Sequence, residues 1–439
     1  MVDFENFQKA RLIPITGIKG AQDQERRATS ALLAVMRAVP SFAQTLLKPF
    51  GAPKGQVETF IEPEFKVGTQ KIRPDGLIVV TRGNKTWTAL VEVKTGKNPL
   101  ELNQLHSYLD ICRDYGFDAL ITLSNEVLNA SGDHPTAGID QRKLRSIKLG
   151  HYSWVKLITE AIILTEHDGL ADVEQDFVLT ELIRFLQSEA SGASEFNDMG
   201  PAWASVRNGI KNGSLRKPDA DVEQIVLNFQ ALVRYSALTL AARLGVGARE
   251  VVPRMARKDP KKYLGAQLKQ LVDGKTLSGS IHIPDAAADL ELEADLAAGV
   301  LRCGFSVDAP ADGRNKTRIN WVLRQLKNAP PRTFLSWSYR HARSPEMAHR
   351  INDLNDEDYS YDLSKEREIS SFRIEVVFNM GLKRLGGKGG FIDSVVDAYE
   401  TVYGELLQPF KSWKRRAPKL SEKVTEIIPE QDPVSPRGW

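Results

Sequence analysis

The amino-acid sequence predicts a mixed α+β (α/β) protein with more than one domain. The chain has 439 residues, which is more than one hydrophobic core usually accommodates. Apolar residues recur at helical spacing in some segments and alternate with polar residues in others, so both helices and strands are expected. The composition, 42% hydrophobic and 26% charged, is that of a folded chain and not of a disordered one.

The pattern of elements divides the chain into four parts. Residues 1–168 mix helices with strands and are predicted to form the first domain. Residues 169–274 are mostly helical and are expected to be a connector to a second α+β domain of unknown role, residues 275–409. Residues 410–439 combine prolines with basic residues, so we expect a flexible tail there.

The first domain begins with a helix and three strands. The helical spacing of apolar residues predicts a helix that Asp23 caps and Pro40 ends. Three strands are expected next, and the turn at 82–85 between the second and the third favours an antiparallel meander. The predicted strands are residues 57–61, 71–80 and 87–94.

A second helix and a further strand complete the predicted core. Apolar residues at helical spacing predict a helix over 102–112. The apolar run 117–123 directly after it is typical of a strand that lies parallel to its neighbour. The order α-β-β-β-α-β therefore predicts a mixed sheet flanked by helices, followed by a strand at 145–149 and a helix at 154–164.

The remainder of the chain follows the same two patterns. Basic residues interleave with aromatic ones between Arg314 and Tyr339, which suits a nucleic-acid surface or, more commonly, a solvated helix beside core aromatics. Helices are predicted at 176–187, 225–244, 264–272 and 315–326. Strands are predicted at 278–283, 290–296, 300–307, 333–339 and 372–379.

Charge and cysteine content exclude several classes of protein. The 59 basic and 56 acidic residues give a net charge of +3, which excludes a histone-like protein but allows a local basic groove. Cys112 and Cys303 can form neither a disulfide framework nor a four-cysteine zinc site, and they indicate a reducing compartment. The sequence contains no recognisable signal peptide and no long apolar run, so we expect a cytoplasmic protein with no membrane partner.

Charged residues lie on two neighbouring strands of the predicted sheet. Asp75 follows Pro74 in the second strand, and Glu92 and Lys94 come at the end of the third. Because side chains alternate along a strand, Glu92 and Lys94 share one face, whereas Val93 faces the other side. A hairpin between the two strands brings Asp75 alongside Glu92. Such charges in an apolar sheet cost stability unless they are paired or bind a metal.

The chemistry of these three residues suits hydrolysis of a phosphodiester. Two carboxylates, Asp75 and Glu92, can hold a hard divalent cation such as Mg²⁺, for which Mn²⁺ can substitute. The cation stabilises charge on the phosphate and lowers the pKa of a bound water. The amine of Lys94 can orient or help to deprotonate that water, or neutralise the phosphate.

Three further polar residues are predicted near this spot. Glu25 lies on the apolar face of the first helix, where a lone carboxylate needs a partner such as a metal shell. Gln104 and Tyr108 are four residues apart, so they share a face of the later helix that differs from its leucine stripe. We expect these two side chains to reach the site or the phosphate of a bound strand.

The constellation resembles the signature of the PD-(D/E)XK nuclease superfamily, over about the first third of the chain. The order α-β-β-β-α-β also matches the restriction-endonuclease-like core of that superfamily. The glutamine and tyrosine after the lysine are similar to the extra motif of its RecB-like and lambda-exonuclease-like branch. The motifs stand here as Pro74-Asp75, Glu92-Val93-Lys94 and Gln104-x-x-x-Tyr108.

The resemblance implies a role for each residue. It implies a Mg²⁺-dependent deoxyribonuclease whose partner is DNA, with RNA left open, in bacterial anti-phage defence, restriction or DNA repair. The resemblance does not reach the C-terminal half, which we separately expect to bind a protein partner or to form an oligomer. The implied residues are Asp75 and Glu92 as metal ligands, the carbonyl of Val93 as a further ligand, Lys94 as the catalytic lysine, Glu25 as an auxiliary metal-shell residue, and Gln104 and Tyr108 as residues that position the nucleic acid.

Each of these residues also has an ordinary structural interpretation. Asp75 before a glycine is common in turns, and Glu92 with Lys94 could form a solvated ion pair. Glu25 could be a first-turn acid that the helix dipole favours, and the glutamine and tyrosine could belong to the helix surface and the core edge. Two rival functions are also open: a module that binds nucleic acid without cutting it, and a nuclease that a partner activates.

Overall fold

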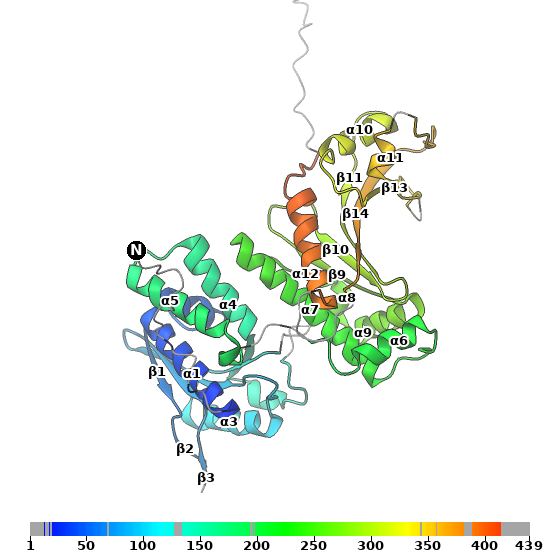
Figure 1. Cartoon of the computed structure of the whole chain (residues 1–439). Helices are drawn as coiled ribbons and strands as arrows, with labels where there is room; N and C mark the ends of the chain where they lie inside the picture. Colours follow the sequence, from blue (N-terminus) through cyan, green and yellow to red (C-terminus); the bar gives the residue numbers. More distant parts are fainter. Residues whose placement is uncertain are drawn as a thin grey trace, which may run out of the picture.

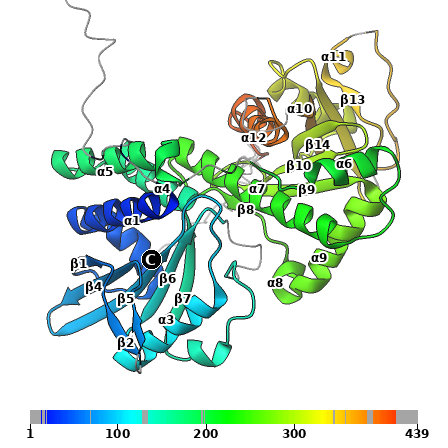
Figure 2. The ribbon, with the colours of Figure 1, turned by 60° about the horizontal axis from the view of Figure 1, so that its bottom comes forward.

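The computed structural model has two lobes, each containing helices and strands (Figures 1 and 2). The buried apolar residues of the first lobe end at Ala193 and those of the second begin at Met199. The predicted mixed α+β class is confirmed. The described residues are 13, 17, 20–67, 70–126, 134–193, 196, 198–342, 345–356, 358–381 and 389–413, so most of the predicted tail at 410–439 lies outside them.

The first lobe is built on a five-stranded mixed sheet. Its strands are β1 (Gln56–Ile61), β4 (Gly76–Arg82), β5 (Lys85–Val93), β6 (Ala119–Ser124) and β7 (Lys148–Ser153). They follow the order β1-β4-β5-β6-β7, in which β1, β4 and β5 are antiparallel neighbours and β6 and β7 run parallel to β5. The predicted antiparallel meander and the parallel strand beside it are therefore confirmed.

Helices cover both faces of this sheet. They are α1 (Ala21–Ala38), α2 (Pro40–Leu47), η1 (Lys48–Phe50), α3 (Leu102–Tyr115), η2 (Gln141–Leu144), α4 (Trp154–Ile162), η3 (Ile163–Asp168), α5 (Val173–Leu186) and η4 (Glu189–Ser191). α1, α2, α4 and α5 share one apolar cluster with the sheet, and α3 packs on the opposite face (Figure 2).

Two boundaries in this lobe differ from the prediction. α1 begins after Gly20, so Asp23 lies in its first turn and is not the predicted cap. η2 ends at Leu144, just before the strand expected at 145–149, and β7 starts only at Lys148.

The chain departs from the prediction between β1 and β4. Two short strands, β2 (Phe65–Val67) and β3 (Gln70–Ile72), form a separate antiparallel hairpin. The single strand predicted over 71–80 is therefore wrong, because Pro74 has no N–H to donate and the chain turns before β4. Asp75 precedes β4 instead of lying within a strand. An added Cβ at Gly76 would lie 2.6 Å from Leu33 Cδ1, so this glycine permits the close approach of α1.

The second lobe is built on a seven-stranded antiparallel sheet. Its strands are β8 (Arg249–Glu250), β9 (Thr276–His282), β10 (Leu290–Asp295), β11 (Val300–Asp308), β12 (Thr333–Tyr339), β13 (His349–Arg350) and β14 (Ile369–Asn379). Their order is β13-β12-β14-β11-β10-β9-β8. The five strands predicted in this region are present, and the two-residue strands β8 and β13 were not predicted. The helices are α6 (Trp203–Lys211), α7 (Ala220–Leu244), α8 (Arg254–Lys258), α9 (Pro260–Lys269), η5 (Gln270–Gly274), α10 (Asn315–Gln325), α11 (Ile351–Leu354), α12 (Phe391–Val402) and η6 (Tyr403–Leu407).

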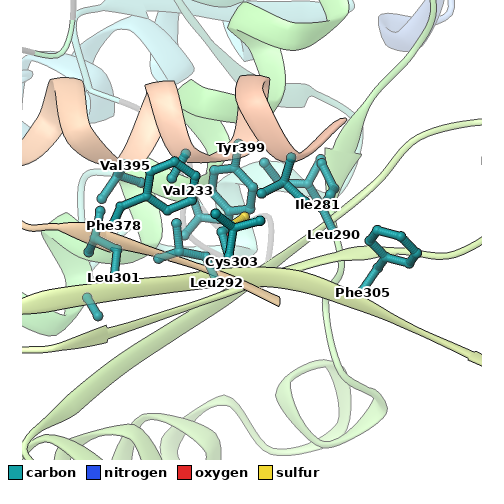
Figure 3. Packing of buried hydrophobic residues seen from close by; sticks show 14 of the residues in the cluster. Val233, Ile281, Leu290, Leu292, Leu301, Cys303, Phe305, Phe378, Val395 and Tyr399 are labelled. Carbon is teal, nitrogen blue, oxygen red and sulfur yellow. The ribbon is translucent and has the colours of Figure 1, made fainter. Parts of the chain in front are cut away.

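The core of the second lobe lies between this sheet and the helices α7 and α12. Figure 3 shows Val233 of α7 and Tyr399 of α12 packed over the apolar side chains of the sheet, among them Cys303 and Leu292. All four side chains are buried, and the Tyr399 hydroxyl donates to the Gly279 carbonyl at 3.0 Å. This hydrogen bond satisfies the one polar group that Tyr399 brings into the core.

The helices predicted as a connector are divided between the two lobes. α5 contributes buried residues to the first lobe, whereas α6, α7 and η5 contribute to the core of the second. The two lobes also touch along α7. Thr159 Oγ1 donates to the Leu238 carbonyl at 3.4 Å, and His167 Nε2 donates to the Ala242 carbonyl at 2.9 Å.

Among the described residues, one helix has the length and mean hydropathy that a membrane-crossing helix needs. It is α7, and 56% of its most apolar window is buried inside the second lobe. α1 and the segment Pro40–Phe50 meet this test only as a pair that is bent by 110°. The apolar character of α7 is accounted for by its place in the core of the second lobe.

Phe305→Ala is expected to lower the free energy of unfolding by about 3–5 kcal/mol, because it removes a fully buried ring and leaves a cavity. Urea denaturation followed by tryptophan fluorescence measures the change. Phe177→Ala is the matched control, since Phe177 is 54% exposed and its loss should cost less than about 0.5 kcal/mol. Equal effects of the two substitutions would contradict the burial of Phe305.

Candidate active site

The residues predicted to carry the chemistry meet at one end of the first sheet. Gly76 of β4 lies opposite Val91 of β5, so Asp75, just before β4, lies opposite Glu92. The N–H of Val93 donates to Asp75 Oδ2 at 2.7 Å, which fixes the Asp75 carboxylate against β5. The hairpin between β4 and β5 therefore brings Asp75 alongside Glu92, as the sequence predicted.

Glu92 is a fully buried carboxylate. It is 0% exposed, and the ammonium nitrogen of Lys94 lies 2.6 Å from Glu92 Oε1. Apart from this ion pair, neither oxygen of Glu92 has a hydrogen-bond partner among the described residues. Burial, followed by the charge of Asp75, raises the pKa of Glu92 to about 8. A carboxyl group in this position favours either a proton on it or a cation beside it.

Lys94 lies just beyond β5, between two carboxylates. Its Nζ is 2.6 Å from Glu92 Oε1 and 3.4 Å from Glu25 Oε1 on α1. Burial lowers the pKa of Lys94, but the charge of Glu92 and then that of Glu25 outweigh this effect, so the pKa lies above its ordinary value. Burial also raises the pKa of Glu25, and Lys94 opposes this. The structure thus brings Glu25 to the site through Lys94.

Two hydrogen bonds fix the backbone of Lys94. Its N–H donates to the Leu123 carbonyl at 2.7 Å, and its carbonyl accepts from Trp154 Nε1 at 2.9 Å. Leu123 belongs to β6, and Trp154 is the fully buried first residue of α4. The parallel strand and the helix α4 together set the position of the lysine.

The predicted pair on α3 lies beside Glu92. Gln104 Nε2 donates to the Tyr108 hydroxyl at 2.8 Å, and that hydroxyl donates to the Arg73 carbonyl at 3.4 Å. Tyr108 is 3% exposed, and burial, followed by the charge of Glu92, raises the pKa of its phenol. Tyr108 is therefore a neutral phenol close to Glu92, and Gln104 holds it in place.

The donor set at this strand end suits a hard divalent cation. Asp75 and Glu92 offer carboxylate oxygens, the ligands that Mg²⁺ and Mn²⁺ take, and the buried oxygens of Glu92, which accept no hydrogen bond among the described residues, favour a cation beside them. Among the residues that the structure describes, no group of three or more His, Cys, Asp or Glu side chains is arranged to hold a metal. A cation here would take its other ligands from water or from a bound phosphate. The carbonyl ligand expected at Val93 stays a prediction.

A polar row that the sequence analysis missed continues from Glu92 across the sheet. Thr122 of β6 is in register with Glu92 and with His151 of β7, so the three side chains lie on one face. Thr122 Oγ1 lies 2.9 Å from His151 Nδ1 and 2.8 Å from His134 Nε2. The row therefore joins the two histidines to the strand beside the site.

The hydrogen-bond partners determine the protonation of both imidazoles. The Glu126 carbonyl, 2.9 Å from His151 Nε2, can only accept, so His151 is protonated at Nε2 and accepts from Thr122 at Nδ1. The N–H of Thr136 donates to His134 Nδ1 at 3.1 Å, so His134 donates from Nε2 to Thr122. Both rings are neutral, and burial lowers the pKa of each to about 4.

A signal for this row was present in the sequence. Thr122 interrupts a strand whose residues are buried on both faces. A hydroxyl in such a strand needs a hydrogen-bond partner. Its partners His134 and His151 follow 12 and 29 residues later, and these separations match no sequence motif that would have identified them.

Comparisons with known proteins identify no relative of this chain. No family model matches it, and no curated protein or solved structure matches it. Its function must therefore be inferred from the residues of the site and their geometry.

Glu92→Gln is expected to remove a loss of stability at alkaline pH. The raised pKa means that folding costs free energy once Glu92 ionises, so stability falls as pH rises from about 4.5 towards about 8. Without metal, the free energy of unfolding of the wild type should fall by about 1–2 kcal/mol from pH 6 to pH 8 more than that of the variant. Urea titrations in EDTA measure both slopes. Equal slopes would contradict a protonated, buried Glu92.

His151→Gln is expected to reduce the sensitivity of the fold to mild acid. The folded pKa of about 4 is below the ordinary 6.5, so the unfolded state binds the proton first, and the stability present above pH 6.5 is lost as pH falls towards 4. Between pH 7 and pH 5 the loss due to His151 should be about 2 kcal/mol. The exposed His341, changed to Gln, is the control. If the His151 variant kept the full acid dependence in urea titrations, the neutral imidazole would be ruled out.

Proposed function

We propose that this chain is a Mg²⁺-dependent nuclease that hydrolyses phosphodiester bonds of DNA, with Mn²⁺ able to replace Mg²⁺. The observation that carries the proposal is the meeting of Asp75, Glu92 and Lys94 at one end of β4 and β5. A purely structural ion pair accounts poorly for this arrangement. Buried carboxylate oxygens without hydrogen bonds cost stability, and apolar residues of similar volume would avoid that cost.

The proposed roles follow from the contacts. Asp75 and Glu92 would hold the cation, since both carboxylates lie at the same strand end. Bound Mg²⁺ supplies charge stabilisation to the phosphate and lowers the pKa of a bound water. Lys94, kept charged by Glu92 and Glu25, offers a positive charge to the phosphate or orients the attacking water. Tyr108, a neutral phenol held by Gln104, lies close to Glu92 on the side of α3.

The order of elements supports the same proposal. The sequence α1-β1-β4-β5-α3-β6 has the α-β-β-β-α-β order of the restriction-endonuclease-like core, apart from α2 and η1 after the first helix and the inserted β2–β3 hairpin. Asp75, just before β4, and Glu92 and Lys94, at the end of β5, lie close together, which supports a catalytic role for the PD-(D/E)XK-like motif. We therefore infer that the first lobe, whose apolar core extends to Ala193 and so beyond the boundary predicted at residue 168, is a nuclease domain. We assign a targeting or partner-binding role to the second lobe, in anti-phage defence, restriction or DNA repair.

A partner-activated nuclease is the second candidate function. Lys94 is engaged by both Glu92 and Glu25 in this structure, so a change that redistributes these ion pairs would change the reactivity of the site. No described residue of the second lobe belongs to the constellation, which leaves this lobe available to bind a partner.

Cutting assays test the proposed function directly. The purified protein is incubated with supercoiled plasmid, linear duplex, single-stranded DNA or RNA, each with Mg²⁺, Mn²⁺ or EDTA. We expect metal-dependent cutting of DNA by the wild type. Glu92→Ala and Lys94→Ala should each lower the rate by about 10²–10⁴-fold, because each removes charge that the transition state needs.

Lys85→Ala is the matched control, because Lys85 is an exposed lysine at the opposite end of the same strand. Its rate should equal that of the wild type. Cutting of RNA alone would correct the substrate class. If no substrate were cut with either metal, the proposal that the chain is a nuclease without a partner would be wrong. A gel-shift assay with the same nucleic acids would then identify a protein that binds nucleic acid without cutting it.

A further inference from the structure

The segment that leaves the first lobe is docked on the loop that carries Lys94. The N–H of Gly96 donates to the Gly192 carbonyl at 2.8 Å. The side-chain amide of Asn125, just after β6, donates to the Gly96 carbonyl at 2.9 Å and to the Gly192 carbonyl at 2.8 Å. Three hydrogen bonds therefore join the loop after Lys94, the end of β6 and residue 192.

The same segment is docked on α1. Gln24 Nε2 donates to the Ala190 carbonyl at 3.0 Å and to the Glu189 carbonyl at 3.4 Å. Gln24 directly precedes Glu25, whose carboxylate contacts Lys94. The loop of the lysine and the helix of its second carboxylate therefore share one anchor, the segment 189–193.

Gly192 lies where only glycine fits without displacing a neighbour. Its φ is +68°, and an added Cβ would lie 2.4 Å from Gln24 Oε1 and 2.9 Å from Thr95 Cβ. Thr95 is 1% exposed and directly follows Lys94, so it cannot give way without moving the lysine loop. Ser191 is also fully buried, which makes this segment a packed part of the lobe.

We propose that Gln24, Asn125 and Gly192 are positioning residues for Lys94, and that the segment 189–193 makes the cutting rate depend on the second lobe. The inference rests on the proposed nuclease function and names a means of regulating the same site. None of the three residues touches the carboxylates of Asp75 or Glu92 through a hydrogen bond among the described residues. They act by holding the loop and the helix that hold the lysine.

The chain itself provides the connection to the second lobe. The core of that lobe begins at Met199, six positions after Ala193, and Asp198 Oδ2 lies 3.7 Å from Lys97 Nζ, so a movement of the lobe would act on the docked segment and on the lysine loop. A shift there is passed to Gly96 and to Gln24 together, because both are bonded to the segment. Lys94 would then lose its place between its two carboxylates.

Gly192→Ala tests the proposal against a closely matched control. Gly213 also has φ +68°, but an added Cβ there has no atom within 4 Å, so Gly213→Ala reproduces the backbone strain without the contact. We expect Gly192→Ala to lower kcat for DNA cutting by about 10- to 100-fold at unchanged KM, because Lys94 is displaced while substrate contacts remain. Gly213→Ala should change neither constant. Gln24→Ala alone removes the hydrogen bonds to the segment without adding bulk and should also lower kcat.

Hydrogen exchange of the full chain gives a readout that needs no activity. Peptides that cover residues 94–98 should exchange faster in Gly192→Ala than in Gly213→Ala. Asn125→Ala should have the same effect without added bulk, and it replaces Gly192→Ala if that variant loses protection throughout the sheet. If the wild type cut no substrate, but residues 94–98 still exchanged faster in the variants than in the wild type, the docking would stand and the nuclease proposal would fall. If the wild type cut and both variants kept wild-type kcat and exchange, the positioning proposal would be overturned.

Discussion

One buried positive charge, the ammonium of Lys94, constrains the arrangement of the first lobe. It lies between Glu92 and Glu25, which come from a strand and from the first helix. Charges in a low-dielectric interior must be matched, since removing one partner leaves the other uncompensated at a cost of several kcal/mol. The strand end, α1 and α4 must therefore come together at the same point, and the fully buried Trp154 fixes the lysine backbone there.

The same constraint explains the irregular backbone before β4. The Asp75 carboxylate accepts the Val93 N–H, so a side chain takes the place that a strand partner would otherwise fill. Pro74 needs no such partner, and Gly76 admits Leu33 of α1. The hydrogen bond from the Val93 N–H lowers the cost of placing Asp75 beside the sheet. Glu92 receives no such bond among the described residues.

The sequence predicted the parts of the structure that depend on periodicity. Alternation along β5 placed Glu92 and Lys94 together, and the turn after β4 predicted the register that brings Asp75 to Glu92. Contacts between segments distant in the chain were not predictable in this way. The docking of Gly192 depends on its positive φ and on its close approach to Gln24 and Thr95, and no pattern in the sequence indicates either feature. For the same reason, periodicity identified α5, α7 and α9 but neither the short helices α6 and α8 nor the core to which each helix belongs.

The order of strands in the second lobe has a consequence for how the protein behaves in a crowded solution. The outermost strands of its sheet, β8 and β13, are two residues long. A long outer strand presents a row of free backbone donors and acceptors to which a strand of another molecule can add. Strands as short as β8 and β13 offer little of this template, so the seven-stranded sheet is protected from edge-to-edge aggregation by the shortness of its margins.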